Sequence, residues 1–170
     1  MSTFFYFNLI GSFDFSVDRL SQLFLCVEAS YCYNPSKPNI YHTHVHAADV
    51  TLGVNVIGKA VGSVHGVALL MAAIMHDYHH PGVSNDYLVR DLDPLAVTYN
   101  DSSVLENFHA AEGFNLIMNP RFDFFKGWKT EEVKNFRQAF VKCILATDLA
   151  LSTEYIAKFQ RLDIIQRKYS

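Results

Sequence analysis

Cysteine is scarce in this sequence and follows no pattern that would build a metal site or a disulfide framework. The chain has 3 cysteines, Cys26, Cys32 and Cys143, set among apolar residues, and no Cys-x-x-Cys pair. Free cysteine commonly behaves as a small buried apolar residue. We therefore expect reduced thiols in an intracellular, cytoplasmic protein, and any metal site must use other residue types.

An excess of positive charge is also missing. The chain carries 14 Lys and Arg against 17 Asp and Glu, a net charge of −3, and it has no run of basic residues. Because contacts to phosphate dominate the binding of nucleic acids, this balance argues against a nucleic-acid partner.

Long hydrophobic runs are absent too. Residues 60–75 form the longest nearly uncharged stretch, which is short for a bilayer span and leads directly into His76 and Asp77. Residues 1–13 are apolar but lack the positively charged start and the small-residue cleavage site of a signal peptide. We therefore expect neither a membrane span nor a secretory leader.

No alternating strand pattern, internal repeat or low-complexity segment is visible, and the dominant period is helical. The spacing of Leu20, Leu23 and Val27, for example, predicts a helix over about residues 17–33, with Ser16 as its N-cap. The same pattern along the chain predicts an all-α fold.

The length of 170 residues is that of one domain with a sizeable core, so we expect residues 1–170 to form a single domain. Asp93 and Thr130 are expected to cap the helices that follow them. We predict a compact multi-helix bundle, with further helices over about residues 44–60, 67–77, 94–98, 103–118, 130–147 and 149–168.

The composition is apolar for a free domain. Half of the residues are hydrophobic, including 14 Phe and 9 Tyr, and the mean hydropathy is slightly positive. Either a partner covers a sizeable surface, or the chain lacks material that would normally cover it.

The histidines of the chain are clustered in the sequence. Of 8 histidines, all but His65 lie in three short stretches, residues 41–49, 75–82 and 105–109, and the last two stretches also hold His-Asp and Glu-x-x-His pairs. Imidazole and carboxylate groups together build divalent metal sites and proton-transfer sites. The clusters therefore favour metal-assisted hydrolysis.

The first two clusters differ in how strongly they point to a metal. His42 and His46 are four residues apart and would share a helix face, although two surface histidines would look the same. His44 lies off that face and is expected to pack or to be exposed. His76-Asp77 closes an apolar run, where an unpaired carboxylate would be costly to bury. The alternative for Asp77 is a hydrogen-bonding residue at the surface.

The third cluster and two aspartates leave alternatives open. Glu106 and His109 would share a helical face, as in metal-binding bundles, or form a solvated pair. Capping explains Asp101 and Asp148 at least as well as chemistry does. Tyr41, beside the first cluster, is expected to be a pocket wall that contacts substrate.

Four ordered blocks within about residues 20–160 are specific in combination. They are YHTHVHAADV at 41–50, HDYHHPGVSNDYL at 76–88, YNDSSVLEN at 99–107 and ILATDL at 144–149. Together they resemble the catalytic domain of class I cyclic nucleotide phosphodiesterases, the hydrolases of cAMP and cGMP.

The resemblance assigns roles to particular residues. It implies that His46, His76 and Asp77 bind Zn²⁺, with Asp77 also bridging to a second ion, usually Mg²⁺ (or Mn²⁺). It implies that His42 is the general acid that protonates the departing ribose 3′ oxygen. It further implies that three residues, His80, Glu106 and Thr147, do not bind the metals directly but hold the waters of the site. His109 is expected beside them.

The chain also departs from the family pattern. Thr43 stands where asparagine is favoured, Phe108 where histidine is usual, and His79 where an acidic residue is common. Ser152 or Thr153 lies near a position usually held by histidine. The family's domain continues for about as much again, so the chain resembles its N-terminal half and is expected to be an incomplete catalytic domain.

The predicted function is metal-dependent hydrolysis of 3′,5′-cyclic nucleotides, cAMP or cGMP or both, to 5′-nucleoside monophosphates, impaired in this chain. The alternative is a non-catalytic form that binds and modulates a full-length phosphodiesterase. The expected protein partner is either a second copy of the chain, in a dimer, or such a full-length phosphodiesterase. A third interpretation is an unrelated His-Asp metallohydrolase whose last ligand is Asp148.

Overall fold

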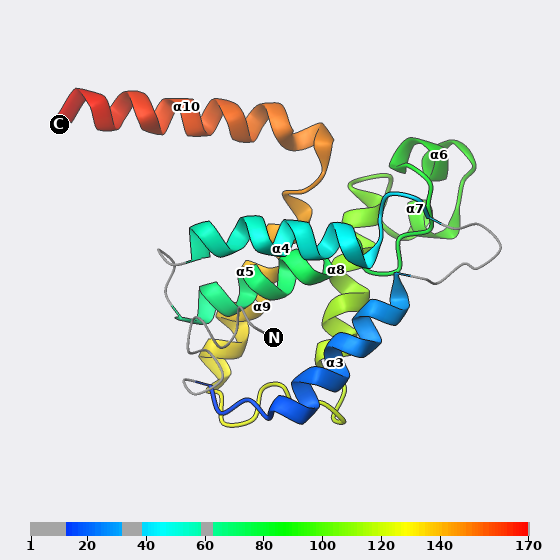
Figure 1. The fold of residues 1–170 in the computed structure, drawn as a ribbon. Helices are drawn as coiled ribbons and strands as arrows, with labels where there is room; N and C mark the ends of the chain where they lie inside the picture. Colours follow the sequence, from blue (N-terminus) through cyan, green and yellow to red (C-terminus); the bar gives the residue numbers. More distant parts are fainter. Residues whose placement is uncertain (1–12, 32–38, 59–62, 170) are drawn as a thin grey trace.

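The computed structural model describes residues 13–31, 39–58 and 63–169, and these residues form helices and loops with no strand among them (Figure 1). The predicted all-α fold class is confirmed. The elements are α3 Val17–Ser30, α4 His44–Gly58, α5 Ser63–Met75, α6 Asn85–Arg90, α7 Pro94–Thr98, α8 Val104–Ile117, α9 Thr130–Leu145, the 3₁₀ turn η1 Leu149–Leu151 and α10 Ser152–Tyr169.

Helix α5 is the centre of the bundle and packs against α4, α8 and α9. Its sequence from Val67 to Met75 has no charged residue, and most of its side chains are buried. The predicted end at residue 77 is wrong, because the helix stops at Met75. His79 takes a positive φ of 60°, and Pro81 follows, so the chain turns where a helix cannot continue.

Aromatic side chains fill the space between α8, α9 and the connector before α9. Phe136 and Phe140 are fully buried and stack with ring centroids 5.8 Å apart. A Cβ on Gly113 would lie 3.3 Å from both the Met75 Sδ and the Phe140 Cζ, so the glycine permits the close approach of α8. Much of the phenylalanine enrichment therefore belongs to the core.

Two of the three predicted caps are confirmed. The Ser16 hydroxyl accepts from the Arg19 N–H at 3.4 Å, and the Asp93 carboxylate accepts from the Leu95 N–H at 2.8 Å. The third is wrong, because the residue that caps α9 is Lys129 and Thr130 is already helical.

Helix α6 was not predicted. Ser84 caps it by accepting from the Tyr87 N–H at 3.2 Å. Six residues are too few to show a helical period, so the sequence alone indicates a loop after Pro81-Gly82. Helices α6 and α7 form a small lobe with a core of its own, made by Leu88, Ala96, Val104 and Leu105 (Figure 1).

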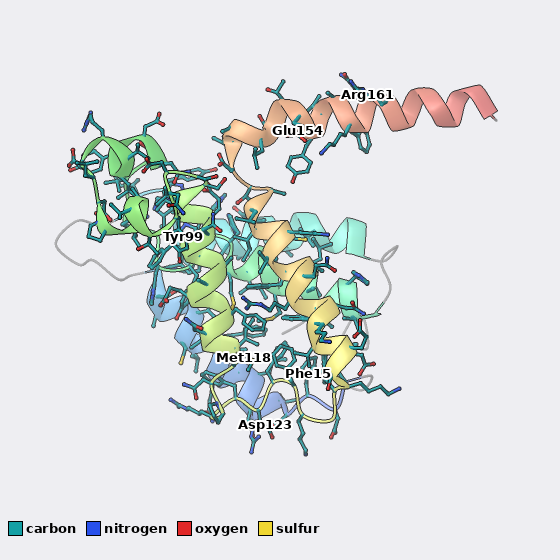
Figure 2. All side chains as sticks on the ribbon, turned by 180° about the vertical axis from the view of Figure 1, so that it is seen from behind. Phe15, Tyr99, Met118, Asp123, Glu154 and Arg161 are labelled. Atoms are coloured by element: carbon teal, nitrogen blue, oxygen red, sulfur yellow. The ribbon has the colours of Figure 1, made fainter. Side chains whose placement is uncertain are left out.

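The last predicted helix is interrupted. Leu149–Leu151 form the 3₁₀ turn η1, and α10 then projects away from the bundle (Figures 1 and 2). Its described apolar side chains are exposed, with Ile156 58% and Phe159 74% accessible. The prediction of a compact bundle therefore holds for α3 to α9 and not for α10.

The cysteine and membrane predictions can be compared with the described residues. Cys26 and Cys143 are half-buried free thiols, and burial raises the pKa of Cys143. Cys32 lies outside the described residues, as do residues 1–12 of the apolar start. Among the described helices, none combines the length and the apolar character that a membrane crossing requires.

Candidate metal centre

Helix α4 places His46 in its first turn. Thr43 caps this helix, since its carbonyl accepts from the Ala47 N–H at 3.1 Å and its hydroxyl lies 3.5 Å from the His46 nitrogen. Threonine and asparagine both cap helices, so the departure from the family pattern at this position keeps the capping function. His44, the first helical residue, is exposed and lines a separate hollow of about 420 Å³ between α3 and α4.

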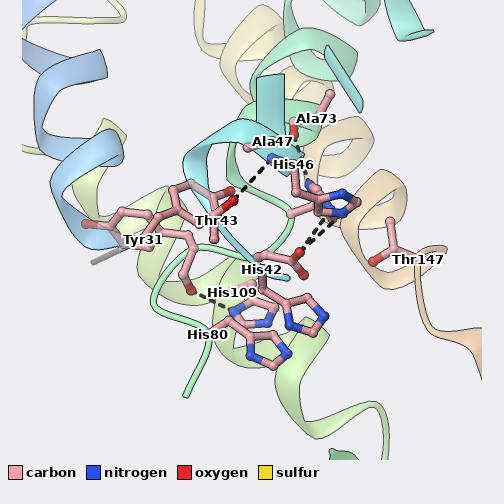
Figure 3. A network of polar contacts seen from close by, with 12 residues as sticks. Tyr31, His42, Thr43, His46, Ala47, Ala73, His80, His109 and Thr147 are labelled. Carbon is pink, nitrogen blue, oxygen red and sulfur yellow. Dashed lines mark hydrogen bonds and ion pairs between the residues drawn. The ribbon is translucent and has the colours of Figure 1, made fainter. Parts of the chain in front are cut away.

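Three potential ligand atoms converge at the end of α5 (Figure 3). The Nε2 atoms of His46 and His76 are 3.1 Å apart, and Oδ2 of Asp77 lies 3.2 Å from His76 Nε2 and 3.6 Å from His46 Nε2. With ligand bonds of about 2.0–2.2 Å, the edges of a tetrahedral or octahedral shell are roughly 2.8–3.6 Å long. The three atoms are thus already spaced as ligands of one divalent cation.

The hydrogen bonding of His76 favours a cation at this point. Its Nδ1 lies 2.9 Å from the carbonyl oxygen of Ala73, which can only accept, so Nδ1 carries a hydrogen. The lone pair of Nε2 in the neutral ring then faces the Asp77 carboxylate, which is repulsive unless a cation or a proton lies between them. Burial works against charge on His76, but Asp77 outweighs it and raises the pKa of His76 overall.

Asp77 is a buried carboxylate that lacks a hydrogen bond at one oxygen. Its Oδ2 has no hydrogen-bond partner among the described residues. Burial would raise its pKa, but the neighbouring His76 opposes this, and the pKa of Asp77 is lowered to about 2. A buried ionised group of this kind is normally paired or bound to a metal, so the alternative of a surface hydrogen bonder is wrong for Asp77.

His42 and His80 form the second part of the site. Their rings stack with centroids 3.8 Å apart and planes 9° from parallel, and each offers a nitrogen within 4.8 Å of an Asp77 oxygen. Burial lowers the pKa of His42, and burial and His42 together lower the pKa of His80 to about 4. His42 precedes α4, so it does not share a helical face with His46, although the two rings lie 6.3 Å apart.

Helix α8 brings in the third cluster. His109 is 1% accessible, and its Nδ1 lies 2.6 Å from the carbonyl oxygen of Tyr78. Its Nε2 is buried and has no hydrogen-bond partner among the described residues. The alternative of a solvated pair is therefore wrong for His109. Its ring centroid is 5.4 Å from that of His80.

Glu106 is held by Asn85, a residue to which the sequence analysis assigned no role. The Asn85 side chain donates to Glu106 Oε2 at 2.9 Å and accepts from the Leu105 N–H at 2.8 Å. Burial raises the pKa of Glu106, with the Asn85 hydrogen bond opposing it. Asn85 belongs to the second sequence block, and that membership was the only available signal of its importance.

Asp148 and Thr147 follow α9. Asp148 accepts from the Ser103 hydroxyl at 2.6 Å and from the Ala150 N–H at 2.8 Å, so both oxygens are occupied and the capping alternative holds. It does not fall in either group of clustered ligands among the described residues. The Thr147 hydroxyl donates to the Ile144 carbonyl at 2.7 Å, and Figure 3 places Thr147 on the loop that borders the cluster.

A cavity of about 740 Å³ with both polar and apolar walls adjoins the cluster. Its walls come from the His42 turn, the α6 segment, the start of α8 and η1, and they include His80, Glu106 and Asp101. Tyr41 is not among them. Its ring is exposed and lies 4.6 Å from the His46 ring, so it borders the ligand cluster instead.

Lowering the pH should destabilise the metal-free chain through His109. Burial, the largest cause, lowers its pKa to about 3, whereas the unfolded residue titrates near about 6.5. Between these two pKa values the unfolded chain binds more protons than the folded chain. The contribution of His109 to the free energy of unfolding is therefore fully present above about pH 6.5 and decreases as the pH falls. We expect urea unfolding to show a loss of about 2 kcal/mol from this residue between pH 7 and pH 5.

The pH dependence of the wild type is compared with that of His109→Asn. The asparagine amide can still donate to the Tyr78 carbonyl but does not titrate. The pH slope of this variant should be shallower than that of the wild type, while His65→Asn, at an exposed helix position, should match the wild type. Equal slopes in the wild type and His109→Asn would contradict the prediction.

The family model and the similar proteins all point to the same family. Residues 41–168 match the family described as 3′5′-cyclic nucleotide phosphodiesterase. A probable 3′,5′-cyclic phosphodiesterase, pde-6, of Caenorhabditis elegans is 38% identical over 88% of this chain and 20% of its own length. The 3′,5′-cyclic-AMP phosphodiesterase 4C of Rattus norvegicus is 33% identical over 91% of this chain and 29% of its own length.

The fold agrees with the sequence. The phosphodiesterase domain of the RhoPDE fusion protein from the choanoflagellate Salpingoeca rosetta superposes with a TM-score of 0.89 at 26% identity, over 97% of this chain and 52% of that one. The chain therefore spans about half of the matched domain and less than a third of these curated relatives. Together with the ordered blocks, these matches establish that the chain belongs to the 3′,5′-cyclic nucleotide phosphodiesterase family.

Proposed function

We propose that this chain carries the metal-binding half of a catalytic domain that hydrolyses 3′,5′-cyclic nucleotides, cAMP or cGMP or both, to 5′-nucleoside monophosphates. The observation that supports it best is the convergence of His46, His76 and Asp77 with spacings of 3.1 to 3.6 Å. Relatives are named for cyclic-AMP hydrolysis and for cGMP inhibition, which favours a purine cyclic nucleotide as substrate.

The donor set suits two ions. His46, His76 and Asp77 would hold Zn²⁺, and Asp77 would also face a second, harder ion, Mg²⁺ or Mn²⁺. When bound, such ions lower the pKa of water and offset the negative charge of the phosphate. The Oδ2 of Asp77 fits this role, because it faces the Nε2 atoms of His46 and His76 and has no hydrogen-bond partner among the described residues.

His42 would act as the general acid. Water loses a proton as its oxygen forms a bond to phosphorus, the bond between phosphorus and the ribose 3′ oxygen breaks, and His42 gives its proton to that departing oxygen. The proton lost by the water balances the one that His42 gives up, so His42 is protonated again for the next turnover. The result is a 5′-monophosphate with a free 3′ hydroxyl. Its place on the wall of the 740 Å³ cavity, with a nitrogen within 4.8 Å of Asp77, supports the assignment.

The remaining predicted residues would order the water of the site. The Glu106 side chain lines the same cavity as His42 and His80, and the His109 ring lies 5.4 Å from that of His80 with its Nε2 free of a hydrogen-bond partner among the described residues. The Thr147 oxygen can accept a hydrogen bond while its hydrogen is donated to the Ile144 carbonyl. His80 would support His42 through their stacked rings. Tyr41 would border bound substrate beside His46.

We also propose that residues 1–170 alone turn over slowly. Asp77 is the only carboxylate in the two ligand clusters of the described residues, so both ions would share it, and Mg²⁺ or Mn²⁺ would find few of the oxygen ligands that hard ions prefer. A weaker hold on the metals reduces the fraction of active sites that are loaded.

Zinc binding tests the ligand assignment. We expect the purified chain to bind zinc in calorimetric titrations, and His76→Ala to lose at least tenfold in affinity because one of three clustered ligands is removed. The matched control is His44→Ala, which removes a nearby α4 histidine outside the cluster. Equal affinities of wild type and His76→Ala would overturn the proposed site.

Hydrolysis tests the acid. With zinc and magnesium added, we expect measurable cAMP or cGMP hydrolysis at a kcat/KM at least tenfold below that of a full-length relative, lowered a further 10²-fold or more by His42→Ala. His44→Ala is again the control. Turnover at a full-length rate would reject the slow-turnover proposal, and unchanged turnover in His42→Ala would reject His42 as the acid.

A second function is favoured by α10, whose described apolar side chains are exposed. Tyr155, Ile156 and Phe159 are 44%, 58% and 74% accessible on a helix that projects from the bundle (Figure 2). Exposed apolar rows of this kind commonly mark interfaces. The alternative proposal is a non-catalytic module that binds and modulates a full-length phosphodiesterase.

Binding to a purified full-length relative tests this alternative. We expect co-elution on size exclusion and a changed hydrolysis rate of the relative, both lost in Ile156→Glu/Phe159→Glu. Lys142→Glu, an exposed charge change on α9, is the control. Separate elution of the two wild-type proteins would exclude the module.

A further inference from the structure

Asn39 bridges the two stacked histidines of the cavity, and it belongs to none of the motifs that the sequence analysis used. Its Oδ1 lies 3.1 Å from the backbone nitrogen of His42 and 3.3 Å from the Nδ1 of the same residue. On the other side, its Nδ2 lies 3.4 Å from the Nδ1 of His80. One amide therefore contacts the same ring atom of both histidines.

The orientation of the amide follows from the backbone. A peptide N–H can only donate, so the atom of Asn39 that faces the His42 nitrogen is the oxygen. The same oxygen then faces the His42 Nδ1, which has to carry a hydrogen to donate to it. In neutral His42 the lone pair is consequently on Nε2.

His80 has the opposite arrangement. Its Nδ1 faces the Asn39 NH₂ group at 3.4 Å and the Gly82 N–H at 2.9 Å, and both of these are donors. The Nδ1 of His80 is therefore the acceptor, and the hydrogen of the neutral ring lies on Nε2. Two rings stacked at 3.8 Å thus carry their hydrogens on different nitrogens.

We propose that Asn39 is a positioning residue that holds His42 as the Nδ1–H tautomer, so that His42 takes up and releases its proton at Nε2, while His80 presents an Nε2–H donor beside it. The chemical role of this arrangement rests on the proposed function, since a general acid is useful only if the proton it exchanges is on the nitrogen that faces the substrate. The tautomer assignment itself rests on the hydrogen bonds alone.

The test is ¹⁵N NMR of the histidine rings in the metal-free chain at about pH 8, where ordinary histidines are neutral. Protonated and unprotonated ring nitrogens have well-separated shifts, so the tautomer is read directly without any activity. We expect Nδ1–H for His42 and Nε2–H for His80. The reverse tautomer for His42 would overturn the proposal.

Two substitutions at position 39 separate positioning from folding. Asn39→Asp keeps an acceptor for His42 and should keep its Nδ1–H tautomer, whereas Asn39→Leu removes the acceptor and should mix the tautomers of His42. His80 should stay Nε2–H in both, because the Gly82 N–H remains as a donor. It serves as an internal reference for an intact loop.

Ile40→Ala, at a neighbouring side chain that is 93% exposed, is the matched control and should behave as wild type. If Asn39→Leu leaves the His42 tautomer unchanged, the proposal fails. In hydrolysis assays, Asn39→Leu should lower kcat about tenfold with little change in KM, and Asn39→Asp should retain most of it. Failure of hydrolysis in the wild type, with the tautomers as expected, would reject the proposed function and leave the tautomer assignment standing.

Discussion

The structure is organised around an ionised carboxylate at the end of a buried apolar helix. Because α5 packs against α4, α8 and α9, its C-terminal end is held inside the bundle. Asp77, which follows this end, is buried there. A carboxylate in that place needs a positive partner. His46 from α4 and His76 from the same turn approach it closely enough to share one cation. The packing of α4 on α5 thus brings His46 to this carboxylate, while α8 brings the buried His109 near it.

The elements that were predicted well are those that carry their own signal. Helices α3, α7 and α8 have clear periods or caps, and their ends were predicted within a few residues. The sequence indicated that Asp77, at the end of an apolar run, would need a cation if it is buried, and the structure shows that it is buried. Helix α6 was missed because six residues carry no period; the still shorter α7 was predicted only from Asp93-Pro94, which marks its start.

Other features depend on tertiary contacts, which the sequence does not reveal. His42 and His46 do not share a helix face, because α4 begins at His44; they belong to two different ligand groups that share Asp77. Nothing in the Glu-x-x-His spacing distinguishes a solvated His109 from one buried against the Tyr78 carbonyl. The family blocks marked these positions without indicating which nitrogen of each ring carries a hydrogen.

Asn85 connects the lobe formed by α6 and α7 to the start of α8. By contacting both the Leu105 N–H and Glu106, it joins the two ends of the excursion formed by α6 and α7. That excursion has a small core of its own around Leu88 and Ala96. Because that core also contains Val104 and Leu105 of α8, the excursion is tied to α8 twice, by the Asn85 side chain and by apolar packing, so a change within it would act on the helix that carries Glu106 and His109.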